Sequence, residues 1–231
     1  MPAALLLLMA LLITPTPLDA QDSTHPSVAS HLLREQEQFW KSPLKIRRGD
    51  VKWLAPLGAG AAALLATDWR VSNAARRSAD LRPASRVVSR LGGSLPMTAA
   101  AGSMWALGRI ANDEKAARTG RLATEALLET ELLVGGLKVL TRRERPNKPG
   151  GHGGFLAGGR SFPSGHAATT FAFATVVSHQ YGNRPLVVVG AYGLATAVSL
   201  SRIGGLNHFP SDVLIGATIG HLVGRYVIHH H

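Results

Sequence analysis

Six apolar segments with helical periodicity constrain the fold of this chain more than any other feature. Gly and Pro residues punctuate the connections, and no segment has the alternation of polar and apolar residues that is typical of a strand. We therefore predict an all-α fold, a helical bundle of about six core helices. The predicted helices cover residues 51–67, 95–111, 121–140, 166–181, 186–201 and 211–228.

The composition agrees with one helical domain. Of 231 residues, 45% are hydrophobic and 25 are Gly, which suits closely packed helices with small side chains, and no internal repeat is visible. The chain has no Cys, so disulfides, thiolate metal sites and a Cys nucleophile are excluded.

The chain divides into four predicted parts. Residues 1–20 contain an apolar run and end in a small residue, so they are predicted to be a secretory signal peptide, although their start carries no Lys or Arg. This predicts an extracytoplasmic, periplasmic protein. Residues 21–50 form a polar, basic lead-in segment, residues 51–228 the helical domain, and residues 229–231 a tail or tag remnant without chemistry.

A membrane location is weighed from helix length and charge. A span needs about 20 apolar residues, and most of the predicted helices are shorter or contain charges such as Glu125, Glu129 and Glu131. We expect a soluble or peripheral, membrane-associated domain, with an integral membrane protein as the alternative.

The formal net charge of +11 predicts an anionic partner: nucleic acid, an acidic membrane surface or a phosphate-bearing substrate. An arginine-rich stretch at residues 70–90 is interpreted as a solvated basic face. It lacks the interleaved aromatic residues expected for base stacking, so nucleic acid is not predicted as a partner.

Lys138 and Arg145 form the first of three polar clusters, and Pro146 follows directly. Seven residues are close to two helical turns, so both cations are predicted on one face of a helix that Pro146 ends. They would converge on one anion. The alternative is a basic helix end that complements the helix dipole.

The second cluster, residues 161–166, directly precedes an apolar helix. Pro163, Ser164 and Gly165 would expose free backbone amides at a helix N-terminus, which is a natural phosphate site, and would place His166 beside the ligand. Alternatively, Ser164 is an ordinary helix cap and His166 a surface residue.

The third cluster holds Ser201, Arg202, His208 and Asp212. Asp212 lies in the first turn of the last helix and could accept a hydrogen bond from His208. This bond would fix the imidazole tautomer and leave the other ring nitrogen free to attack. The alternative is an incidental His/Asp pair.

Together, these three clusters, in this order, resemble the signature motifs of the type 2 phosphatidic acid phosphatase and vanadium haloperoxidase superfamily, without departure. The resemblance implies a helix bundle of the acid phosphatase/vanadium haloperoxidase type and a phosphoric ester hydrolase that needs no cofactor or metal. It implies that His208 attacks phosphorus, that Asp212 orients His208, and that His166 protonates the leaving oxygen. The residues implied to bind the phosphoryl group are Lys138, Arg145, Ser164, Gly165 and Arg202.

Two other functions remain open. One is a vanadium haloperoxidase, in which vanadate would occupy the same pocket; the short chain favours the phosphatase branch. The other is a basic module that binds anionic lipid or nucleic acid without turnover, which would not account for His208 and Asp212. The candidate substrates are phosphatidic acid, phosphatidylglycerol phosphate, a polyprenyl pyrophosphate, a lipid A phosphate and soluble phosphomonoesters. Apolar helices and the basic charge favour a lipid phosphate.

The remaining histidines rank lower. His152 lies in a glycine-rich loop and could touch the substrate, whereas His179 and His221 are expected on helix faces without a catalytic role. The chain has no HExxH spacing, so the sequence does not support a zinc site.

Overall fold

The computed structural model describes residues 51–78, 80–148 and 151–231. The predicted signal peptide and lead-in segment lie outside these residues. The described part is all-α and contains no strand, which confirms the predicted fold class. Its helices are α3 (Val51–Arg77), α4 (Leu81–Leu91), α5 (Ser94–Ile110), α6 (Glu114–Thr141), α7 (Gly165–Gln180), α8 (Pro185–Gly204) and α9 (Pro210–His230).

Each of the six predicted helices is present, and the largest differences in their boundaries are at α3 and α6. The arginine-rich stretch, for which no helix was predicted, is mostly helical: α3 runs on to Arg77, and α4 forms an additional helix from Leu81 to Leu91. Helix α6 begins at Glu114, seven residues before the predicted start, because Asp113 caps its first turn by accepting a hydrogen bond from the amide of Ala116.

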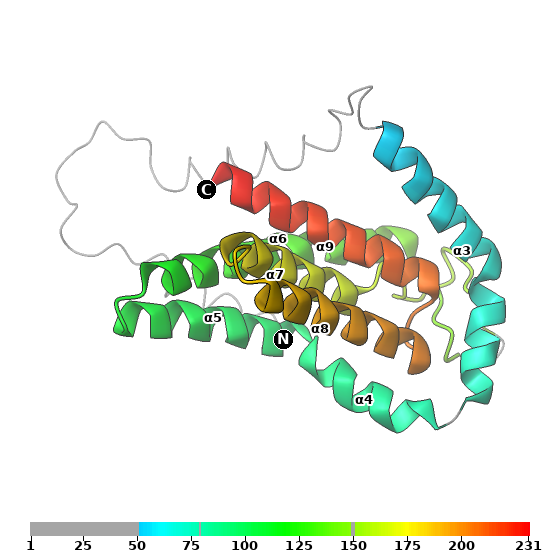
Figure 1. Ribbon diagram of the computed structural model, residues 1–231. Helices are drawn as coiled ribbons and strands as arrows, with labels where there is room; N and C mark the ends of the chain where they lie inside the picture. Colours follow the sequence, from blue (N-terminus) through cyan, green and yellow to red (C-terminus); the bar gives the residue numbers. More distant parts are fainter. Residues whose placement is uncertain (1–50, 79, 149–150) are drawn as a thin grey trace. The chain divides into compact units, whose positions relative to one another are not determined.

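Helix α7 lies at the centre of the bundle, between α6, α8 and α9 (Figure 1). Its buried face is rich in small residues, including Ala168 and Ala172. A Cβ built on Gly220 of α9 would overlap the carbonyl oxygen of Ala168, so the two backbones are in direct contact. This close packing fixes where the N-terminus of α7 meets the start of α9.

A hydrophobic core lies between α5, α6, α7 and α9. Its large members are Met97, Leu122, Leu127, Val176 and Val227, all at most 7% exposed. Burial of such side chains stabilises each by roughly 1.5–3 kcal/mol, so this core holds the four helices together.

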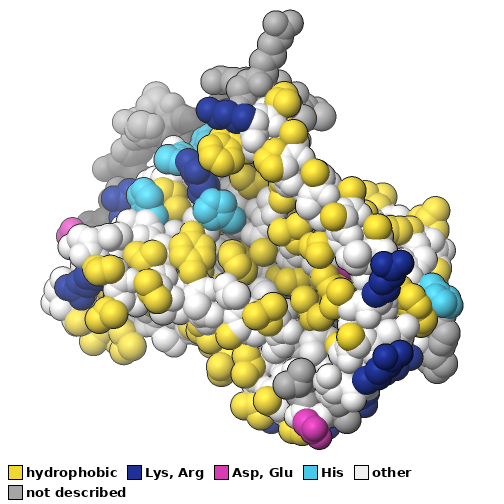
Figure 2. Space-filling view, turned by 45° about the vertical axis from the view of Figure 1, so that its right-hand side comes forward, with side chains coloured by type: hydrophobic (Ala, Val, Ile, Leu, Met, Phe, Trp, Pro, Cys, Tyr) yellow, Lys and Arg dark blue, Asp and Glu magenta, His cyan; other side chains and the backbone are white. Residues whose placement is uncertain are grey.

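Helix α8 differs from the core helices. Within the described residues it is the one helix long and apolar enough to cross a membrane, judged by length and composition. Only 28% of its most apolar window is buried, and Leu186, Val189 and Leu200 are exposed. Figure 2 shows hydrophobic side chains spread over the middle of one face of the molecule, with Lys and Arg side chains mainly toward its margins.

Candidate active site

A cavity of about 290 Å³ opens where the ends of α6 and α8 meet the start of α7. Six of the eight predicted site residues line it; Ser164 and Asp212 do not. The lining residues are Ser94, Glu131, Val134, Gly135, Lys138, Arg145, Arg160, Gly165, His166, Arg202 and His208.

Lys138 and Arg145 both line the cavity, but they do not share a helix face as predicted. Helix α6 ends at Thr141, because Arg142 adopts a left-handed backbone conformation (φ 43°) at the C-cap. Arg145 therefore lies in the irregular segment beyond the helix. Burial and the neighbouring Arg145 lower the pKa of Lys138 to about 8. The convergence of the two cations predicted from the sequence is present, although the local structure that achieves it is different.

The N-terminus of α7 faces the cavity through Gly165 and His166. Ser164 is the N-cap: it is fully buried, and its hydroxyl accepts from the amide of Ala167 at 3.5 Å. A Cβ on Gly165 would lie 3.5 Å from Nζ of Lys138, so the ammonium group sits beside the helix N-terminus. Burial and the nearby Arg202 lower the pKa of His166 to about 3, so this imidazole is neutral at neutral pH.

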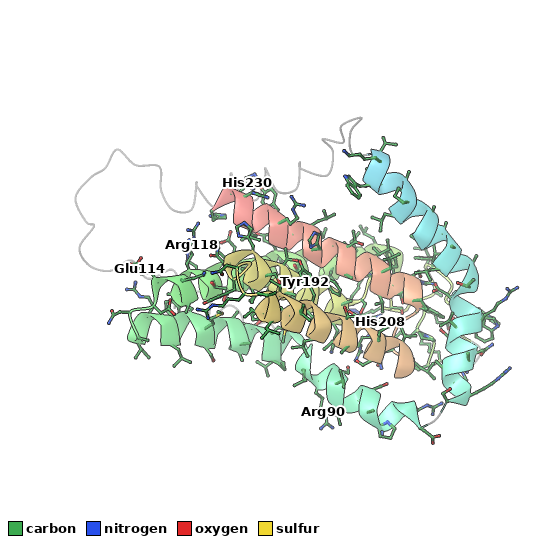
Figure 3. All side chains as sticks on the ribbon, viewed as in Figure 1. Arg90, Glu114, Arg118, Tyr192, His208 and His230 are labelled. Atoms are coloured by element: carbon green, nitrogen blue, oxygen red, sulfur yellow. The ribbon has the colours of Figure 1, made fainter. Side chains whose placement is uncertain are left out.

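His208 lies in the connection between α8 and α9 and is only 2% exposed (Figure 3). Its Nδ1 atom lies 2.6 Å from the backbone carbonyl oxygen of Ser161. A carbonyl only accepts, so Nδ1 carries the proton and Nε2 keeps its lone pair. The predicted hydrogen bond to Asp212 is not formed, because Oδ2 of Asp212 is 3.7 Å from Nδ1. Burial lowers the pKa of His208 to about 4, although Asp212 opposes this shift.

Asp212 is fully buried behind His208 and is surrounded by donors. Its Oδ2 atom accepts from the hydroxyl of Ser161 at 2.6 Å and from the amide of Phe209 at 2.9 Å, and Oδ1 accepts from Arg143 at 2.6 Å. Burial alone would raise the pKa of Asp212, but His208, Arg143 and Ser161 outweigh it and hold that pKa below its usual value. Asp212 is therefore a buried carboxylate next to an uncharged imidazole.

The comparisons with known proteins agree with this geometry. The model of the PAP2 superfamily matches residues 121–231, which include all eight predicted site residues. Residues 121–231 belong to the PAP2 superfamily. Two solved structures are similar to it, each 25% identical: a transmembrane PAP2 type phosphatidylglycerolphosphate phosphatase from Bacillus subtilis (TM-score 0.56, covering 76% of this chain and 94% of that one) and LpxE from Aquifex aeolicus (TM-score 0.54, covering 71% and 94%).

Two curated relatives of this PAP2 chain are phosphatases by name. A lipid A 1-phosphatase from Porphyromonas gingivalis is 49% identical over 66 residues, which is 28% of this chain and 15% of that protein. A decaprenylphosphoryl-5-phosphoribose phosphatase from Mycobacterium tuberculosis is 39% identical over 92 residues, which is 39% of this chain and 49% of that protein. The chain thus spans less than half the length of either relative.

Two arginine side chains of the PAP2 cavity, Arg145 and Arg202, have incomplete hydrogen bonding. Within the described residues, the buried Nε atoms of Arg145 and Arg202 have no hydrogen-bond partner. Nη1 of Arg202 is held by the hydroxyl of Ser89 on α4. Both guanidinium groups line the cavity, and an arginine that does so can bond a phosphate oxygen there.

Sequence reasoning missed three polar side chains that line the PAP2 cavity. Arg160 adds a fourth cation from the loop before α7, and Glu131 adds a carboxylate that accepts from the hydroxyl of Ser94. Glu131 lies two helical turns before Lys138 and hence on the same face of α6, which is a signal that could have placed it at the site.

The lower-ranked histidines do not line this cavity. The ring of His152 contacts that of Trp69 in a tilted arrangement, with 4.3 Å between their centroids. His179 contacts His229, and Nδ1 of His221 lies 3.0 Å from the hydroxyl of Thr175. Among the described residues, no group of three or more His, Asp or Glu side chains is arranged to hold a metal ion.

Proposed function

We propose that this PAP2 protein is a phosphatase that hydrolyses lipid phosphates through a phosphohistidine formed on His208. One observation carries the proposal. The proton of His208 is held on Nδ1 by the carbonyl of Ser161, so the lone pair of Nε2 is available beside a cavity lined by four cations.

The residues divide the reaction into two steps. In the first, Nε2 of His208 attacks phosphorus and a P–N bond forms while the P–O bond to the alcohol breaks; His166 gives its proton to the departing oxygen. In the second, water attacks phosphorus, the P–N bond breaks, and His166 takes the proton from the water. Inorganic phosphate leaves and His208 returns to its neutral form.

The cations of the cavity supply the electrostatic stabilisation. The charge that develops on the phosphoryl oxygens is met by Lys138, Arg145 and Arg202, together with the amides at the start of α7. Hydrogen bonds from fixed cations to phosphate oxygens are about twice as strong as neutral ones. We therefore propose that the reaction needs no metal ion.

His166 takes up its proton from solvent when the substrate binds. In the free protein its pKa is about 3, because burial and Arg202 disfavour the imidazolium. A bound phosphate dianion neutralises this cationic surrounding and favours the protonated form. The general acid is thus charged only when a phosphate is present.

A lipid is the substrate class that the surface favours. The outward-facing apolar side chains of α8 would rest against acyl chains, so the protein is proposed to associate with a membrane. The relatives named above are phosphatases of lipid A, of decaprenylphosphoryl-5-phosphoribose and of phosphatidylglycerolphosphate. The apolar pattern of residues 1–20 supports an extracytoplasmic, periplasmic location.

The test measures phosphate release with EDTA present, from a soluble aryl phosphate and from a dispersed lipid phosphate. The parent should release phosphate, faster from the lipid, and His208→Ala should release none. His179→Ala is the matched control, because this histidine lies away from the cavity, and it should keep the parent rate. No release by the parent, or halide oxidation that needs vanadate and peroxide, would refute the proposal.

A further inference from the structure

A buried series of ion pairs joins α3 to Asp212. Nη2 of Arg143 lies 2.7 Å from Oδ2 of Asp68, and Nη1 of the same guanidinium lies 2.6 Å from Oδ1 of Asp212. The three side chains are at most 3% exposed. Asp68 is outside the three sequence clusters. Arg143 lies within the span of the first cluster but was not a predicted site residue, and neither side chain lines the cavity.

Arg143 is fully engaged away from the phosphate site. Its Nε donates to the carbonyl of Gly153 at 3.0 Å, and Nη1 also donates to the hydroxyl of Ser211 at 2.7 Å. The guanidinium lies over the rings of Phe155 and Phe209, at 4.8 Å and 4.5 Å from their centroids. Every nitrogen is occupied, in contrast to the unpaired Nε atoms of Arg145 and Arg202.

Asp68 also holds the first turn of α9. Its Oδ1 atom accepts from the amide of Ser211 at 3.0 Å, and Oδ2 accepts from the hydroxyl of Ser211. Ser211 is the residue before Asp212, so the carboxylate of α3 fixes the backbone from which Asp212 projects. The two buried residues of α3 are both polar, Asp68 and Ser72, so burial of apolar side chains does not explain this contact.

The series has a net negative charge. Two carboxylates share one guanidinium, and in the low dielectric of the interior the remaining charge is weakly screened. Because Arg143 is divided between Asp68 and Asp212, it neutralises neither completely. The charge favours the cationic form that the His208 ring takes when Nε2 bonds to phosphorus.

We propose that Asp68 and Arg143 are positioning residues that orient Asp212 and set the negative potential at His208. This inference rests on the proposed phosphohistidine function. It extends the machinery to α3, a helix that contributes no residue to the cavity lining.

Asp68→Asn is the sharpest test, because the amide keeps an acceptor for Ser211 and removes the charge. The kcat should fall about tenfold, whereas KM should stay within about twofold because the cavity cations are untouched. The acidic limb of kcat/KM should move to lower pH by about half a unit, since less negative charge favours neutral His208. The charged and titratable groups around His208 are Lys138 of α6, His166 of α7, Arg202 of α8 and Asp212 of α9.

Ser72→Ala is the matched control on the same helix. Ser72 is 1% exposed, and its hydroxyl has no hydrogen-bond partner within the described residues. The variant should keep the parent kcat and pH limb. Asp68→Asn and Ser72→Ala could both lose activity only in proportion to the loss of folded protein, with no change in the acidic limb of kcat/KM. In that case α3 has only a structural role and the proposal is wrong.

Arg143→Lys provides a second test. A lysine keeps the charge but has no planar fork to bond Asp68, Asp212 and Gly153 together, so kcat should fall further than in Asp68→Asn. KM should again change little. An Arg143→Lys enzyme with the parent kcat would overturn the proposal.

A titration of the His208 ring by NMR separates this inference from the proposed function. The resonance is assigned by its absence in His208→Ala, and its pKa should be lower in Asp68→Asn than in the parent. This shift requires no turnover. If Asp68→Asn lowers the pKa of His208 but the parent releases no phosphate, the network is supported and the phosphatase function is refuted. If the substitution leaves this pKa unchanged and the parent is active, the network alone is refuted.

Discussion

The imidazole of His208 donates from Nδ1 to the backbone carbonyl oxygen of Ser161, 2.6 Å away. The tautomer of the proposed nucleophile is therefore set by a backbone carbonyl. The Asp212 carboxylate, whose Oδ2 lies 3.7 Å from Nδ1 of His208, contributes negative charge. Control of the tautomer and stabilisation of charge are thus separate in this site. Substitutions can distinguish them, because a side-chain change leaves the carbonyl of Ser161 in place.

Asp212→Asn should slow hydrolysis about a hundredfold without abolishing it. The substitution removes the charge that stabilises the phosphohistidine cation, worth about 1.5–3 kcal/mol for a charged interaction, but not the bond that fixes the tautomer. The measurement is kcat for folded protein, compared with His208→Ala. Ser161→Ala keeps the backbone carbonyl and loses one hydrogen bond to Asp212, so its kcat should fall no more than about tenfold. An Asp212→Asn enzyme as inactive as His208→Ala would contradict this assignment.

Acid should destabilise the folded protein before its carboxylates titrate. Burial lowers the pKa of His208 from 6.5 to about 4, so the unfolded chain binds a proton there that the folded protein does not. This destabilisation of the folded protein is absent above pH 6.5 and grows as the pH falls to about 4, where it reaches about 3 kcal/mol. The free energy of unfolding, measured across this range, should fall less steeply in His208→Asn. Equal slopes for parent and variant would be inconsistent with a buried neutral His208.

Binding of inorganic phosphate should be accompanied by proton uptake near neutral pH. His166 has a pKa of about 3 in the free protein, and a bound dianion raises it. A group whose pKa rises on binding takes up a proton between the two values, so phosphate affinity should weaken as the pH increases through the bound-state pKa. Calorimetry in buffers of different ionisation enthalpy measures this uptake. His166→Gln should bind phosphate with less proton uptake; unchanged uptake would assign the proton to another group.

The sequence predicted the three motif clusters because each consists of residue types whose spacing is local. Lys138 to Arg145 and residues 161–166 each span two helical turns or fewer, and Ser201 to Asp212 spans about three. Asp68 and Arg143 were missed because their partnership joins positions 75 residues apart and depends on how α3 meets the bundle. The bond from His208 to the carbonyl of Ser161 was missed for a related reason: backbone acceptors leave no signature in side-chain patterns.

Two other differences from the predicted fold are the greater length of α6 and the presence of the additional helix α4. The first turn of α6 is polar and carries Glu114 and Lys115, so the apolar periodicity starts later than the helix does. Helix α4 contains Arg82, Arg86 and Arg90 and has few buried residues, so its apolar periodicity is too weak to predict a helix. Ser89 of α4 contacts Arg202, so this helix lies beside the site.

Gly220→Ala and Gly102→Ala should change stability in opposite directions. A Cβ on Gly220 would overlap the carbonyl oxygen of Ala168, and packed helices accommodate such an atom only by moving apart, which costs about 1–3 kcal/mol. Gly102 lies within α5, and a Cβ there would meet no described atom within 4 Å, so alanine should stabilise the helix by roughly 0.5–1 kcal/mol.

The same pair should differ in activity. Moving α7 away from α9 displaces Gly165 and His166 from the cations of the cavity, so Gly220→Ala should lose kcat even at temperatures where it stays folded. Gly102→Ala should keep the parent kcat. Thermal unfolding and phosphate release, measured on the same preparations, test both statements. A Gly220→Ala protein with parent stability and activity would show that the contact between α7 and α9 does not position the site.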